Sequence, residues 1–468
     1  MRFLTPPAAK PEQTGPEADA RYRALRWQVF SGAFIGYAAF YIVRKNLSMA
    51  IPSITDLTAG AITKGDLGTV LAMNAVAYAF AKFFMATVSD RSNARKFLPL
   101  GLVLSALAMM FMVVPIAGLD IANCPENKTW AILLMGVLNF LVGWFNGMGW
   151  PPCGRVMTHW FSQNERGTWM SFWNCAHNVG GGLVGPMATY GAMWFGSWFY
   201  GNNENLYFLA GTFIFPAAVA LLIALVAYCL LRDNPQSCGL PSIEKWRNDF
   251  PKNYSEKSEQ VLSTKEILFK YVFNNKMLWF VAIANAFVYM VRYGALDWAP
   301  AILTDKGIDL KSAGWAYFAF EYAAIPGTII CGWISDKVFR GMRALPTIIF
   351  MALVAIFIVI YWQAGDNMTL NLIGLVGIGF FIYGPVALTG VQALNLVPKN
   401  AAGTAAGFVG LFGYFIGDAI CSKIFVGGVA SAFDWNVANL TVAAGALIGV
   451  LLCALLIRPE ARQAAANK

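Results

Sequence analysis

Residues 28–52 read QVFSGAFIGYAAFYIVRKNLSMAIP, an apolar run that is interrupted by Arg44 and Lys45. A helix needs about 20 mostly apolar residues to cross the hydrocarbon core of a bilayer. This stretch therefore predicts a membrane-spanning helix with a charge inside the membrane. Such a charge costs at least about 2.5–3.5 kcal/mol on insertion scales, so Arg44 is a candidate functional residue.

The same pattern returns in the second half of the chain, where residues 277–303 read MLWFVAIANAFVYMVRYGALDWAPAIL. Tyr289-Met-Val-Arg292 follows Tyr41-Ile-Val-Arg44 at a separation of 248 residues. Two more matches come in the same order, at separations of 246 and 236 residues: Ser89-Asp90-Arg91 with Ser335-Asp336-Lys337, and Arg166-Gly167-Thr168 with Ala402-Gly403-Thr404. Three ordered matches indicate a duplicated unit. Repeats that run in the same direction typically place a substrate site between them, near the bilayer midplane.

The composition agrees with a membrane protein, because 58% of the 468 residues are hydrophobic and only 13% are charged. Soluble domains carry about 25% charged residues. We predict an all-α fold of about twelve membrane-spanning helices in two six-helix halves. The predicted spans are residues 28–52, 66–88, 97–116, 130–152, 168–194, 206–231, 277–303, 313–335, 345–363, 369–396, 403–430 and 437–458.

The charges alternate from loop to loop. Lys and Arg gather after the second and eighth spans, in the central polar stretch and after the last span, whereas the other loops hold mainly acidic residues. The positive-inside rule then places both termini and the central loop in the cytoplasm. The net charge of +9 fits this rule or an anionic substrate. It does not indicate nucleic-acid binding, because the cations are scattered over short loops and form no basic domain.

The predicted organisation has five parts. They are a cytoplasmic N-terminal segment (1–27), a first six-helix half (28–231), a cytoplasmic linker (232–275), a second six-helix half (276–458) and a cytoplasmic tail (459–468).

Arg44 and Arg292 are expected at the same depth, facing one another across the interface between the halves. Two guanidinium groups repel each other unless an anion lies between them, and their planar fork suits phosphate. We therefore predict a shared anion site. The alternatives are side chains that reach the membrane surface, or ion pairs with nearby carboxylates.

Other polar residues within the spans are candidates for the same site. Lys45, Lys82, Asp297 and Glu321 pair either with one another or with the substrate, because an unpaired buried charge is costly. His177 titrates near neutral pH and is either a packed core residue or a substrate ligand. The tyrosines predicted to line the site are Tyr41 and Tyr289, which precede the two arginines by three residues, together with Tyr383 and Tyr414.

No Walker motif, nucleophile elbow, HExxH sequence or paired-cysteine metal site occurs in the sequence. We therefore expect no enzyme activity, no cofactor and no metal.

Several motifs resemble a known family. The loop sequences Ala86-x-x-x-Asp90-Arg91 and Gly332-x-x-x-Asp336-Lys337 resemble the loop signature of the major facilitator superfamily, and we expect them to act as gating loops. Within it, the chain resembles the bacterial organophosphate:phosphate antiporters, above all those that carry glycerol 3-phosphate. The matching stretches are Tyr41–Asn46, Gly147–Gly154, Trp173–Gly182, Asn234–Leu240, Arg292–Trp298 and Ala401–Gly407.

The resemblance implies that Arg44 and Arg292 bind phosphate with the help of His177. It also implies alternating access by rocking of the halves, exchange of external glycerol 3-phosphate for internal phosphate, a bacterial inner-membrane location and a monomer. Asp418 and Lys423 are closer to the hexose-phosphate carriers of the group. At 3.6 residues per turn they lie about 140° apart on a helix, which predicts that they do not pair. A hexose-phosphate or phosphoglycerate exchanger, a sugar-phosphate sensor and a proton-coupled symporter stay open as alternatives.

Overall fold

The computed structural model describes residues 2–90, 92–196, 204–248, 265, 267–339, 342–397 and 402–466. Every regular element within these ranges is helical, which confirms the predicted all-α class. The first group of helices is α1 (Pro16–Ile42), α2 (Asn46–Leu57), α3 (Lys64–Asp90), α4 (Ala94–Met110), α5 (Val113–Ala117), α6 (Lys128–Asn146), α7 (Trp150–Trp160), α8 (Gln163–Asn174), α9 (Ala176–Gly191), α11 (Glu204–Leu209) and α12 (Phe215–Leu230).

The second group follows a short helix, α13 (Ile243–Arg247), in the central polar stretch. It contains α15 (Lys276–Leu296), α16 (Ala299–Asp305), α17 (Leu310–Trp333), η7 (Ile334–Val338), α18 (Ala344–Gln363), α19 (Met368–Asn395), α20 (Ala402–Leu411), η9 (Phe412–Val426), α21 (Gly427–Ala432) and α22 (Trp435–Ala466).

Helices lie at each of the twelve predicted spans in the described part of the chain. Eight helical segments there are long and apolar enough to cross a membrane. The other four predicted spans are those that contain Arg44, Lys82, His177 and Glu321. Arg292, by contrast, lies in one of the eight, Lys276–Leu296.

The first and the last long helices extend well beyond their predicted spans. The first, α1, begins at Pro16, inside the segment predicted as a polar N-terminus. Proline at the first helical position loses no intrahelical hydrogen bond, and Glu17 and Asp19 in the first turn complement the helix dipole. The last helix, α22, continues to Ala466 and so includes most of the predicted tail.

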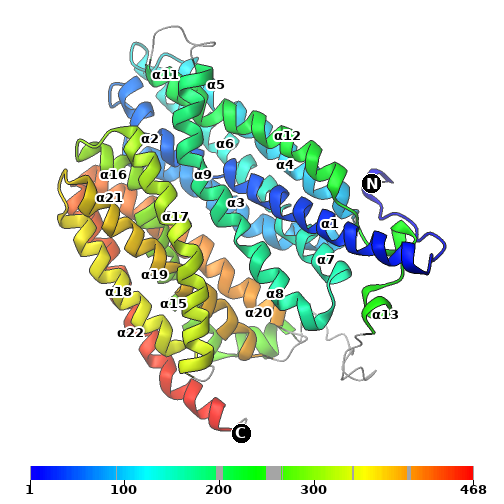
Figure 1. Ribbon diagram of the computed structural model, residues 1–468. Helices are drawn as coiled ribbons and strands as arrows, with labels where there is room; N and C mark the ends of the chain where they lie inside the picture. The colour runs from blue at the N-terminus through cyan, green and yellow to red at the C-terminus, as the bar shows by residue number, and fades with distance from the viewer. Residues whose placement is uncertain are drawn as a thin grey trace.

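The helices gather in two groups that follow the order of the chain. Figure 1 shows α1 to α12 on one side and α15 to α22 on the other. The two groups meet where α3 packs against η9 and where α9 packs against α17. The assignment of the halves and linker to domains stays a prediction.

Contacts between the groups concentrate at the helix ends that lie away from the chain termini. Gly185 of α9 crosses Gly314 of α17 so closely that a Cβ at position 185 would lie 2.2 Å from the carbonyl oxygen of Gly314. Lys64 forms an ion pair with Asp305. The backbone N–H of Gly65 donates to Ser431 Oγ at 2.6 Å. Small residues allow this close approach of helices, as is usual in membranes.

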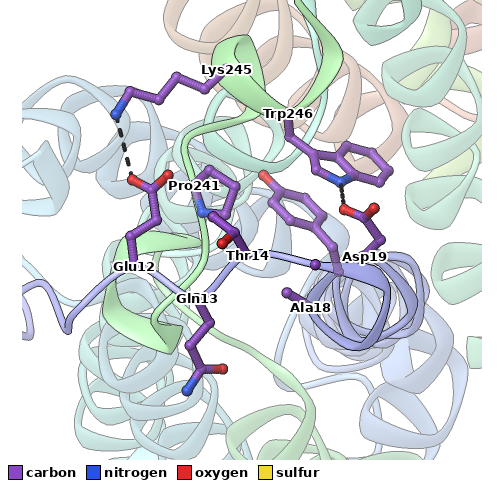
Figure 2. Close-up of a pocket in the computed structure, with 10 residues that line it drawn as sticks. Glu12, Gln13, Thr14, Ala18, Asp19, Pro241, Lys245 and Trp246 are labelled. Atoms are coloured by element: carbon purple, nitrogen blue, oxygen red, sulfur yellow. Dashed lines mark hydrogen bonds and ion pairs between the residues drawn. The ribbon is translucent and has the colours of Figure 1, made fainter.

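The start of α1 packs against the first part of the central polar stretch. Tyr22 stacks on Trp246 with ring centroids 4.3 Å apart. Figure 2 shows Trp246 Nε1 donating to Asp19, at 2.8 Å, and Lys245 reaching Glu12. The residues after α12 therefore pack against the first group of helices.

Glu165, in the first turn of α8, joins the same contact region. It pairs with Arg26 of α1 and, at 3.2 Å, with Arg247 of α13. Burial raises the pKa of the Glu165 carboxyl, but the hydrogen bond and charge of Arg26, the Ser162 backbone N–H and the charge of Arg247 together outweigh it, so the pKa lies below its ordinary value. A lowered carboxyl pKa stabilises the folded state at neutral pH, and this contribution is lost only in acid.

Replacing Gly185 with Ala is expected to destabilise the protein by about 1–3 kcal/mol, because the added methyl meets backbone atoms of Gly314 that cannot rotate away. The measurement is thermal unfolding in detergent, followed by tryptophan fluorescence. Gly428→Ala is the matched control, since nothing lies within 4 Å of a Cβ placed there. Equal melting temperatures for the two variants would contradict the close crossing of α9 and α17.

Candidate functional site

Arg44 lies in a break between two helices rather than inside one. Helix α1 ends at Ile42 and α2 begins at Asn46, so residues 43–45 connect them. Arg292, its repeat partner, lies within continuous α15, and the corresponding break follows at Asp297 and Trp298. The repeat therefore holds in sequence, whereas the local backbone differs between the two copies.

The Arg44 side chain is 5% exposed and is surrounded by tyrosine rings. Its guanidinium carbon lies 3.7 Å from the ring centroid of Tyr78, 5.4 Å from that of Tyr414 and 5.5 Å from that of Tyr41. Cation–π contacts of this kind contribute about 0.5–2 kcal/mol each. Its Nε has no hydrogen-bond partner.

Arg292 is 4% exposed and has a similar aromatic environment. Its guanidinium carbon lies 4.1 Å from the ring of Tyr383 and 4.7 Å from that of Tyr293. Tyr289, whose ring is 5.9 Å away, also packs against Tyr414, with centroids 5.0 Å apart. Tyr414 thus contacts the surroundings of both arginines.

A chain of hydrogen bonds leads from Arg292 to a buried acid. Arg292 Nη2 donates to the hydroxyl of Tyr383 at 3.0 Å, and this hydroxyl donates to Glu321 Oε2 at 2.6 Å. Asn178 of α9 donates to the same oxygen at 2.9 Å. Glu321 therefore influences Arg292 through Tyr383 and also ties α17 to α9.

His177 lies between the tyrosines of the two arginines. Its ring centroid is 5.5 Å from that of Tyr41 and 5.8 Å from that of Tyr383. Its Nδ1 contacts the backbone oxygen of Asn174, just before the break between α8 and α9. That contact leaves Nε2 for another partner.

Lys82 is half-buried, and its Nζ faces the rings of Tyr414 at 5.7 Å and Trp150 at 5.8 Å. Lys45 has a different environment, because it forms an ion pair with Asp297 at 2.6 Å. Of the four charged residues whose partners the sequence left open, Lys45 and Asp297 pair directly, while Glu321 is held by Tyr383 and Asn178.

The prediction that Asp418 and Lys423 do not pair is wrong. Lys423 Nζ lies 3.3 Å from Asp418 Oδ1 and also pairs with Asp297. The cause is the helix type: η9 is a π-helix. Its hydrogen bonds join residues five apart, so positions 418 and 423 come onto the same side.

The predicted gating loops are only partly described. Lys337 is exposed in η7. Arg91 lies outside the described residues, as do the side chains of Asp90 and Asp336.

Sequence reasoning missed Tyr78, whose ring covers Arg44 most closely. The available signal was its position four residues before Lys82, on the same side of α3. It also missed Asn178, which directly follows His177 and binds Glu321.

This arrangement is suited to binding an oxyanion. In the described part of the chain neither guanidinium makes an ion pair. Each keeps a buried Nε without an acceptor. Phosphate and carboxylate offer the acceptors that such forks bind.

Comparison with known proteins shows the family of the chain. The model of the Major Facilitator Superfamily matches residues 33–422. The glycerol-3-phosphate transporter of Bacillus subtilis is 48% identical, with 93% of each chain covered. That of Haemophilus influenzae is 44% identical, with 97% of this chain and 96% of the relative covered.

More distant relatives have other names. A probable hexose phosphate transport protein of Chlamydia trachomatis is 34% identical, with 97% of this chain and 94% of the relative covered. The membrane sensor protein UhpC of Escherichia coli is also 34% identical, with 88% and 89% covered. Among solved structures, an inward-facing, unoccupied bacterial homologue of the lysosomal transporter Spinster matches with a TM-score of 0.67 and 16% identity, covering 94% of this chain and 96% of its own. That likeness concerns the fold alone.

Replacing Tyr383 with Phe is expected to weaken the binding of inorganic phosphate about tenfold or more, because Arg292 loses the hydroxyl that connects it to Glu321. A hydrogen bond to a charged group contributes about 1.5–3 kcal/mol. The measurement is phosphate binding by isothermal titration calorimetry. Tyr361→Phe is the control, since its buried hydroxyl has no hydrogen-bond partner. Unchanged affinity in Tyr383→Phe would show that this connection does not prepare Arg292 for the anion.

Proposed function

We propose that this chain, which belongs to the Major Facilitator Superfamily, takes up glycerol 3-phosphate in exchange for internal inorganic phosphate. Close relatives are named for glycerol 3-phosphate, and the chain covers nearly their whole length. The observation that carries the proposal is the pair of buried arginines, neither of which forms an ion pair with an acid among the described residues, since a phosphoryl group is common to both exchanged molecules.

The phosphoryl group binds between Arg44 and Arg292. Both guanidinium groups are held by tyrosine rings rather than by carboxylates, so they keep their charge for the ligand. His177, between Tyr41 and Tyr383, has a ring nitrogen that can donate to a phosphate oxygen. Lys82, beside Tyr414, adds a further positive charge. Tyr289 completes the wall next to Arg292.

Exchange follows from the cost of the empty site. Two neighbouring cations without an anion repel each other, and their desolvation is not compensated as the halves close around them. Bound phosphate or phosphate ester removes this penalty. The loaded protein therefore changes conformation readily and the empty one does not, which couples inward and outward transport.

The direction of opening follows from the contacts between the two groups of helices. These contacts concentrate at the ends away from the termini. If both termini are cytoplasmic, as the loop charges indicate, this structure is closed toward the outside of a bacterial inner membrane. Rocking of the two groups then separates them at this end, breaks these contacts and opens the outer side. The transporter acts as a monomer, because each chain supplies both arginines.

The test is exchange in proteoliposomes loaded with phosphate, with labelled glycerol 3-phosphate outside. We expect rapid uptake, reduced roughly 10- to 100-fold in Arg44→Lys and in Arg292→Lys, because Lys lacks the planar fork. Arg21→Lys is the matched control, since Arg21 binds Gln13 at the surface. Equal uptake without internal phosphate would contradict exchange, and dependence on a pH gradient instead would indicate a proton symporter.

A second candidate is exchange of hexose phosphate or phosphoglycerate, which the Asp418 and Lys423 pair favours through its resemblance to hexose-phosphate carriers. Faster uptake of glucose 6-phosphate in the same vesicles would support it, and would leave the arginine site unchanged. A sugar-phosphate sensor would bind these esters without transporting either.

A further inference from the structure

Asp297 is a buried carboxylate that is shared by two lysines. It is fully buried, and its Oδ2 accepts from Lys45 Nζ at 2.6 Å and from Lys423 Nζ. Lys423 also lies 3.3 Å from Asp418 Oδ1. Two cations and two anions thus form one compact cluster whose formal charges cancel.

The two lysines come from different groups of helices. Lys45 lies in the break between α1 and α2, in the first group, whereas Lys423 lies in η9, in the second. Asp297 ends α15, which packs closely along η9. One ion pair of Asp297 therefore crosses between the groups, and the other stays within the second group.

The pair within the second group is held by neighbouring residues. Trp298 Nε1, next to Asp297, donates to the backbone oxygen of Ser422, next to Lys423, at 3.0 Å. Trp298 is itself fully buried. This hydrogen bond keeps η9 and the end of α15 in register, so Asp297 and Lys423 remain together when the groups of helices move.

The ion pair between Lys45 and Asp297 breaks when the two groups of helices separate at the closed end. A buried carboxylate that loses its only cation is strongly disfavoured. Lys423 keeps Asp297 paired after Lys45 has moved away. Its place in a π-helical segment also brings Asp418 near, which keeps Lys423 neutralised in turn.

We propose that Lys423 is a positioning residue for transport: it is the resident counter-ion that keeps Asp297 paired when Lys45 leaves, and so lowers the barrier to opening. The proposal rests on the proposed alternating-access function, yet it concerns a residue that does not touch the substrate. It requires that Lys45 and Lys423 affect the closed state in opposite directions, although both bind the same oxygen.

The test is hydrogen–deuterium exchange of α2 and α16, which pack against each other at the closed end. The experiment uses the full chain in detergent without substrate. Lys45→Met should speed hydrogen–deuterium exchange in both helices about tenfold, because it removes the ion pair that crosses between the groups. Lys423→Met should slow it to a similar extent, because Asp297 then depends on Lys45 alone. Lys423→Arg should behave like the unmodified protein.

Lys245→Met serves as the matched control, because Lys245 pairs with Glu12 at the surface. Lys245→Met should leave hydrogen–deuterium exchange unchanged in both α2 and α16. Faster or unchanged exchange in Lys423→Met would overturn the proposal, since a purely structural lysine loosens the closed state or has no effect on it. The readout needs no substrate, so it is independent of whether glycerol 3-phosphate is the transported ester.

A second variant covers the case in which Lys423→Met does not fold. In Asp297→Asn/Asp418→Asn both carboxylates that pair with Lys423 are gone, so adding Lys423→Met should leave hydrogen–deuterium exchange of α2 and α16 as in that double variant. A triple variant that still fails to fold, or that differs from Asp297→Asn/Asp418→Asn, would show that Lys423 stabilises the helix packing itself and would refute the proposal.

Discussion

Charge that is buried within a bilayer is the constraint on which this structure depends. Each cation inside the spans needs a compensating environment, because the hydrocarbon offers none. Lys45 and Lys423 obtain it from Asp297, and Lys306 at a loop obtains it from the backbone oxygen of Tyr361. Arg44 and Arg292 are different, since tyrosine rings surround them without neutralising them. The structure thus keeps two guanidinium charges available at the boundary between its two groups of helices.

The aromatic residues perform two tasks at this boundary. Their rings stabilise the guanidinium groups and exclude water from them, which strengthens any electrostatic interaction with a ligand. Their hydroxyls connect the site to buried acids, as Tyr383 does between Arg292 and Glu321. Tyr414 contacts Tyr78 of the first group and Tyr289 of the second, so it connects the surroundings of the two arginines.

Contacts that cross between the groups are of several kinds. They include an ion pair, Lys64 with Asp305, a close glycine crossing, Gly185 with Gly314, and aromatic packing of Tyr78 on Tyr414. Within each group, long helices pack along their whole length around apolar side chains. In the Asp297 cluster, the ion pair with Lys45 crosses between the groups, whereas the ion pair with Lys423 stays within the second group.

The sequence by itself determined the spans, the duplication and the two arginines, because hydropathy and repeated motifs are properties of the chain order. The family resemblance followed from the same local motifs. Only the tertiary structure decided which charges pair. Asp418 and Lys423 became neighbours because η9 is π-helical, and Arg44, in the break after α1, lies against the ring of Tyr78 from α3. Such pairings depend on helix phase and on the approach of distant segments, which are set by packing of the whole molecule.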